Sequence, residues 1–150
     1  MRLCHETIQL EQVLPVPPAR AFAAYLNKAD REIWSAPSAT AAVIIDNADV
    51  RTGGSEATRC GGKNDLRFRT EVRYHRVEAN AYLCFSETLY EGDAVLTAAL
   101  ITFDFRAEGD EQTCLILTDQ VTSFVGPEAL TGHRQGFAAS LQNFRNFLNI

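Results

Sequence analysis

The chain has 150 residues, 46% of them hydrophobic and 22% charged, which is the composition of an ordinary globular domain. Its formal net charge of -5 argues against binding to nucleic acid or to an anionic membrane, because both need concentrated Lys and Arg. No apolar run approaches the ~18 residues of a membrane-spanning helix. The N-terminus lacks the apolar core of a secretory signal. We therefore expect one cytoplasmic domain over residues 1–150, without membrane insertion.

The first part of the chain predicts a strand followed by two short helices. Residues 7–14 alternate between apolar and polar side chains, as in a strand with one buried face. Proline is tolerated in the first turn of a helix, so a helix is expected to begin near Pro18 and to end at Asn27. Asp30 is expected to cap a second short helix that contains Trp34, the one tryptophan of the chain.

From Ala41 onward the apolar period changes to two, which predicts strands over 41–45, 55–60, 66–77, 82–90, 95–106 and 113–124. The paired glycines Gly53-Gly54 and Gly61-Gly62 are expected to mark turns on either side of the second of these strands. The clearest strand, 66–77, has one apolar face and one charged face, which is typical of an antiparallel sheet. Its charged face carries Arg67, Arg69, Arg73 and Arg76. We interpret these arginines as a solvated surface, with docking of an acidic partner as the alternative.

The last segment, 128–149, returns to helical spacing. Its apolar stripe consists of Leu130, Phe137, Leu141, Phe144 and Leu148, and beside it runs a stripe of small residues, Gly132, Gly136, Ala139 and Ser140. Each glycine inside a helix costs about 1 kcal/mol relative to alanine. Either this helix approaches the sheet very closely, or the space beneath it is open.

This order of elements and several short motifs resemble the helix-grip superfamily of START and Bet v 1-like proteins. The motifs are Val16 to Phe22 followed by Trp34, the pair Gly53-Gly54, the strand Leu115 to Asp119, and Gly136-Phe137 with Leu141. Within the superfamily, the chain looks most similar to a bacterial branch related to the C-terminal domain of the activator of Hsp90 ATPase. In that family a Trp stands where this chain has Phe137. The resemblance covers essentially the whole chain and implies an α+β fold, with about seven antiparallel strands around the long C-terminal helix.

Such a fold implies a pocket between the concave face of the sheet and the last helix, with a filled core as the alternative. We expect this pocket to bind a small, mainly apolar or amphipathic molecule. The residues expected to line it are Trp34, Phe68, Val72, Tyr74, Phe85, Glu87, Phe103, Asp119, Phe137 and Leu141.

Two acidic residues, Glu87 and Asp119, interrupt apolar strand faces. If both face the pocket, at least one should have a raised pKa and could serve acid–base chemistry or orient a polar ligand group. Alternatively, both are solvated at strand ends or paired with an arginine. His133 is expected near the pocket mouth, where a hydrogen-bonded structural role is favoured over a catalytic one.

Metal and nucleotide motifs are missing from the sequence. His5, His75 and His133 are too dispersed to predict a metal site. Cys4, Cys60, Cys84 and Cys114 are scattered singly and are expected to be reduced. No glycine-rich phosphate loop occurs, so we expect no metal and no cofactor.

Three functions remain open, in order of preference. The first is a non-enzymatic binder. The second is an enzyme of cyclase or hydrolase type that uses Glu87, Asp119 or His133 in the same pocket, with the catalytic residues unknown. The third is a protein-interaction module with a chaperone partner, which rests on the family resemblance alone. The sequence also leaves a homodimer open.

Overall fold

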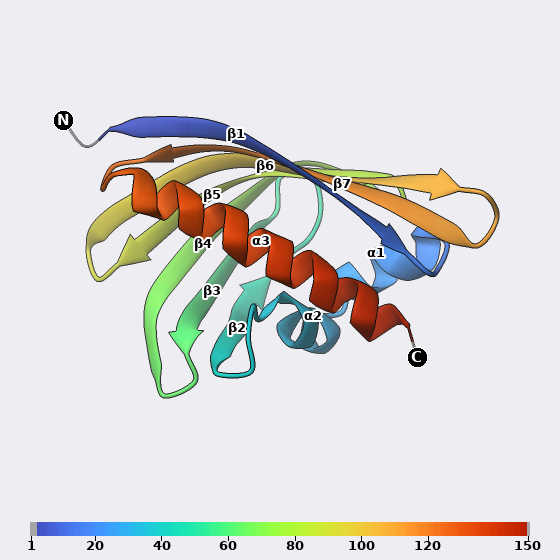
Figure 1. Ribbon diagram of the computed structural model, residues 1–150, viewed down its shortest axis with the longest axis horizontal. Helices are drawn as coiled ribbons and strands as arrows, with labels where there is room; N and C mark the ends of the chain where they lie inside the picture. The colour runs from blue at the N-terminus through green and yellow to red at the C-terminus, as the bar shows by residue number, and fades with distance from the viewer. Residues whose placement is uncertain (1–2, 150) are drawn as a thin grey trace.

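The computed structural model describes residues 3–149. Its elements, in chain order, are β1 (Cys4–Leu14), α1 (Pro18–Leu26), α2 (Lys28–Ser35), β2 (Ala41–Ala48), β3 (Ser55–Gly62), β4 (Asp65–Glu78), β5 (Tyr82–Glu91), β6 (Ala94–Glu108), β7 (Gln112–Ser123) and α3 (Pro127–Leu148). The strands form one antiparallel sheet in the order β1-β7-β6-β5-β4-β3-β2. Figure 1 shows the sheet curving around α3, with α1 and α2 at one end. The predicted α+β helix-grip fold is confirmed.

The alternation of side chains along the strands places one face of the sheet in the core. In β4, Thr70, Val72 and Tyr74 are buried, while Glu71 and Arg73 between them are exposed. Strands β5, β6 and β7 bury the apolar sets predicted from their period, including Phe85, Phe103 and Leu117. Each of these side chains removes a large apolar area from water, which is the main favourable term in folding.

One predicted turn is wrong. Gly61 and Gly62 still pair with β2, opposite Ala42 and Ala41, and the turn itself consists of Lys63 and Asn64. A register shift at this end of β3 and the positive φ of Gly61, +141°, fit a β-bulge, in which a glycine is favoured.

The two short helices meet at Asn27, which ends α1 and caps α2. The Asn27 side chain accepts a hydrogen bond from the backbone N–H of Asp30 at 2.9 Å. The prediction that Asp30 caps this helix is therefore wrong. Asp30 lies in the first turn of α2, where its negative charge favours the helix dipole.

Helix α3 crosses the concave face of the sheet and is tied to α2 (Figure 1). The Trp34 ring stacks on Phe144 with a centroid distance of 4.0 Å and an interplanar angle of 5°. The Ser140 hydroxyl donates to the Ser35 carbonyl at 2.7 Å, and the Asn143 amide donates to the Ala36 carbonyl at 2.8 Å. These contacts fix one half of α3 against α2.

The two glycines of α3, Gly132 and Gly136, border open space. A Cβ added at Gly132 or Gly136 would meet no heavy atom within 4 Å outside its own stretch of helix backbone. Close packing therefore does not explain these two glycines, and the second alternative raised by the sequence is the correct one.

No helix within residues 3–149 is long and apolar enough to cross a membrane.

Candidate functional site

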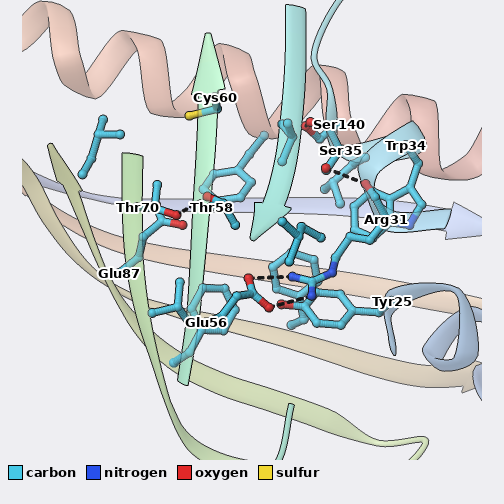
Figure 2. Close-up of a pocket in the computed structure, with 18 residues that line it drawn as sticks. Tyr25, Arg31, Trp34, Ser35, Glu56, Thr58, Cys60, Thr70, Glu87 and Ser140 are labelled. Carbon is cyan, nitrogen blue, oxygen red and sulfur yellow. Dashed lines mark hydrogen bonds and ion pairs between the residues drawn. The ribbon is translucent and has the colours of Figure 1, made fainter. Parts of the chain in front are cut away.

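A cavity of about 230 Å³ lies beneath α3, between α2 and the inner faces of the strands from β2 to β6 (Figure 2). It exceeds the ~150 Å³ apolar cavity that is known to hold benzene. Its walls are mainly apolar and include Trp34, Val72, Phe85, Phe103, Phe137 and Leu141. Its polar groups come from Arg31, Ser35, Glu56, Thr58, Thr70, Glu87 and Ser140.

A second hollow of about 420 Å³ adjoins the cavity along α3. The two share Ser35, Val43, Cys60, Glu87, Phe137 and Ser140 as lining residues. The second hollow, called the groove below, extends past Gly132, His133 and Gly136. Because the two glycines have no side chains, the cavity can be reached through the groove beneath the helix.

A buried ion pair forms one end of the cavity. The Arg31 guanidinium donates to both carboxylate oxygens of Glu56, at 2.8 and 2.6 Å, and the two side chains are only 7% and 4% exposed. The Tyr74 hydroxyl donates to Glu56 Oε1 at 2.9 Å and lies 3.0 Å from the Tyr25 hydroxyl. The Arg31 guanidinium also lies 4.5 Å from the centre of the Tyr25 ring. The negative charge of Glu56 is thus balanced by Arg31.

Sequence reasoning missed this pair, although weak signals were present. Arg31 lies three residues before Trp34, so both lie on one face of α2. Glu56 and Thr58 are two positions apart in β3, and both are buried on its inner face. Nothing in the spacing connects two residues 25 positions apart, so the partners could not be assigned.

Glu87 lies on the inner face of β5, opposite Val72 of β4, and borders both the cavity and the groove. In residues 3–149 no group forms a hydrogen bond or an ion pair with its carboxyl. Burial raises the pKa of Glu87 to about 7; the nearby His133 lowers it, while Asp119 and Glu56 raise it further. The sequence predicted a raised pKa on the condition that both acids face the pocket; Glu87 borders it, whereas Asp119 lines neither hollow.

The Cys60 thiol also lines the cavity. Burial and the neighbouring Glu87 raise the pKa of Cys60 to about 11, so this thiol is protonated at neutral pH. It therefore contributes apolar surface and no nucleophile. All four cysteines are free, as predicted.

Asp119 and His133 form a second buried polar group beside the groove. His133 Nδ1 lies 2.8 Å from Asp119 Oδ2, and His133 Nε2 lies 3.0 Å from the Thr97 hydroxyl. Burial alone would lower the pKa of His133, but its hydrogen bond and attraction to Asp119 outweigh burial and raise it. Thr97 is 1% exposed and lines neither hollow, so it is no accessible nucleophile despite the Thr–His–Asp order.

The predicted lining residues fall into three groups. Those that line the cavity are Trp34, Val72, Phe85, Glu87, Phe103, Phe137 and Leu141. Phe68 lines the groove. Tyr74 and Asp119 are buried but line neither hollow: Tyr74 donates a hydrogen bond to Glu56, and Asp119 forms a hydrogen bond with His133. A ligand contact for any of them stays a prediction. Among the described residues, no cluster of His, Cys, Asp and Glu could hold a metal ion.

The arginines of β4 lie on the outer face of the sheet, as predicted. Arg69 pairs with Glu71 at 2.8 Å and lies 3.9 Å from the centre of the Tyr90 ring, while Arg67 lies 3.4 Å from Glu91. These are exposed contacts of small energetic weight.

Comparison with known proteins agrees with this architecture. The model of the "Activator of Hsp90 ATPase homolog 1-like protein" family matches residues 15–149. The Mll3558 protein of Rhizobium loti has a similar structure, with a TM-score of 0.82, 24% identity and coverage of 99% of this chain and 100% of that one. An uncharacterised protein of Rhizobium leguminosarum matches with a TM-score of 0.82 and 25% identity, over 97% of this chain and 95% of that one.

CV1439 of Chromobacterium violaceum matches with a TM-score of 0.79 and 19% identity, over 96% of this chain and 97% of that one. No curated protein matches the chain. The match to the family model spans nearly the whole sequence, and it agrees with the seven-stranded sheet and the long C-terminal helix. The chain therefore belongs to the Activator of Hsp90 ATPase homolog 1-like family.

Proposed function

We propose that this protein binds a small, mainly apolar molecule in the cavity between the sheet and α3. The observation that carries the proposal is the open space beneath Gly132 and Gly136. Two glycines inside a helix lower its stability by about 1 kcal/mol each, and a filled core would not need them. Both glycines are explained if this part of α3 leaves access to an internal cavity open.

The lining supports an apolar ligand body with few polar contacts. Aromatic and aliphatic side chains form most of the wall, and the buried carboxylate of Glu56 is already paired with Arg31. Pockets for small molecules commonly combine such walls with a few convergent polar groups. Glu87, Thr58 and Thr70 are the candidates for those polar contacts.

The same geometry favours a binder over an acid–base enzyme. Such an enzyme needs two titratable groups within reach of one bound atom. Both ring nitrogens of His133 already have partners, Asp119 and Thr97. Glu87 then remains as a single free acid. The interaction-module alternative rests on the family description, and the open cavity favours a small molecule over it.

The test is native mass spectrometry of the purified protein before and after extraction with organic solvent, followed by a thermal-shift panel of small apolar compounds. We expect an extra mass that extraction removes, or a rise in Tm with members of the panel. Gly136→Leu should fill the open space beneath the helix and abolish both the extra mass and the rise in Tm with the panel. It should not lower the Tm of the protein without ligand. Ala138→Leu, on the exposed side of the same helix, is the matched control. Unchanged binding in Gly136→Leu, or no occupant and no shift in the wild type, would contradict the proposal.

A further inference from the structure

The charges around the cavity and groove do not balance. Three carboxyl groups lie there, the buried Glu56 and Asp119 and the half-buried Glu87, together with two basic groups, Arg31 and His133. Arg31 pairs with Glu56, and His133 pairs with Asp119. Glu87 has no basic partner among the residues that the structure describes, although it borders both hollows.

The groups that act on Glu87 come from every element packed around it, and none complements its charge by contact. They are His133 of α3, Asp119 of β7, Glu56 and Cys60 of β3, and Tyr25 of α1. His133 is committed to Asp119, and the thiol and the phenol are neutral. A carboxylate in such surroundings is stabilised strongly by a cation that arrives with its own hydrogen-bond donors.

From the open cavity, the two ion pairs and the carboxyl of Glu87 that has no partner, we infer that the ligand is an organic amine: a protonated basic nitrogen attached to an apolar body. The inference rests on the proposed binding function and adds the chemical class of the ligand. The ammonium group would lie against Glu87, at the junction of cavity and groove. The apolar body would lie along Phe85, Phe103 and Trp34. A carboxylic acid is disfavoured because its charge would meet that of Glu87.

Binding of an amine should release a proton from the protein. Near pH 7 about half of the Glu87 carboxyls carry a proton, because their pKa is about 7. An ammonium ion favours the ionised form, so complex formation expels about half a proton per site at pH 7. Affinity for the amine should therefore rise as the pH increases from 6 to 8, in contrast to that for a neutral analogue.

The experiment compares phenylbutylamine, phenylbutanol and phenylbutanoate by isothermal titration calorimetry in two buffers of different ionisation enthalpy. We expect the amine to bind at least about tenfold more tightly than the alcohol, as for a hydrogen bond to a charged group. The carboxylate should bind most weakly. Glu87→Gln should erase the preference for the amine and the proton release. Glu71→Gln, an acid on the outer face of the sheet, should leave both unchanged.

This experiment distinguishes a failure of the amine inference from a failure of the proposed binding function. If the alcohol binds as well as the amine, or no proton is released, the amine inference is overturned and the binding function stands. A neutral or acidic molecule co-purified in the cavity would overturn it as well. If none of the three compounds binds, the inference is also overturned, and the mass-spectrometric test decides the binding function separately. The wild-type pH profile decides the inference even if Glu87→Gln does not fold.

Discussion

At the scale of single residues, the same pairing of arginine and carboxylate occurs in two environments. Arg31 and Glu56 are almost fully enclosed, whereas Arg59 and Asp46 form a bidentate pair on the surface. A surface pair is screened by water and contributes little. Enclosed charges have lost their hydration, so each depends on its partner. The environment, and not the chemistry of the pair, sets its importance for the fold.

Removing one partner of the buried pair should be strongly destabilising. We expect Glu56→Gln to lower the free energy of unfolding by about 3–5 kcal/mol, because it leaves the Arg31 charge enclosed without a counterion. The double variant Arg31→Met, Glu56→Leu should lose much less than the sum of the two single changes. Urea unfolding measures Glu56→Gln, the double variant and its two single variants, Arg31→Met and Glu56→Leu. Asp46→Asn, at the surface pair, should leave the unfolding midpoint nearly unchanged. Additive losses in the double variant would show that the pair does not act as a unit.

At the scale of elements, periodicity predicted the strands and α3 to within a few residues, because each element buries one face. It also placed Glu87 and Asp119 on inner faces. Both side chains face inward because the register shift between β5 and β6 falls beyond Glu87, at Leu89 and Tyr90, where Leu96 of β6 is the extra residue, and β6 and β7 pair without a register shift. The partners of these acids could not be predicted, because they lie on distant elements. Only folding brings His133 of α3 to Asp119 of β7.

The His133–Asp119 contact should fasten the first half of α3 to the sheet. We expect His133→Gln to destabilise the protein and to speed hydrogen exchange in the first turns of α3. The pKa of His133 is raised in the folded state, so its charged pairing stabilises fully below a pH of about 6.5 and fades as the pH rises through the folded pKa. The loss in His133→Gln should therefore be larger at pH 5.5 than at pH 8.5. Exchange mass spectrometry and urea unfolding at both values test this.

The matched control for that change is Arg134→Gln on the same helix. Arg134 is exposed and pairs with Glu6 of β1. Its removal should alter neither exchange in α3 nor the pH dependence of stability. An equal effect of the two substitutions would mean that general changes to α3, and not the buried contact, determine how firmly it is held.

At the scale of the whole molecule, the protein is less stable than it would be with a solid core, because the site keeps an accessible carboxyl. A solid core would fill the cavity, replace Gly132 and Gly136 and contain no unpaired carboxyl. The fold retains all three features in one place. Natural proteins commonly accept such local instability where a ligand later compensates for it. The sequence indicated the glycines and Glu87 separately, but only their convergence beneath α3 makes them a site.

Stability should consequently depend on Glu87 in a definite direction. Its pKa is near 4.5 unfolded and about 7 folded, so the folded state binds the proton more tightly. Folding is then favoured at low pH and loses up to about 3 kcal/mol as the pH rises from 4.5 to above 7. Glu87→Gln should remove the part of this decline that comes from Glu87, leave the part that comes from His133, and exceed the wild type in stability at pH 8. Thermal unfolding across pH 5–8 measures both proteins. At pH 8 phenylbutylamine should raise the Tm of the wild type far more than that of Glu87→Gln, because only the wild type has a carboxylate for the ammonium to neutralise. A wild type whose stability is flat over this range would show that Glu87 is not strained in the empty site.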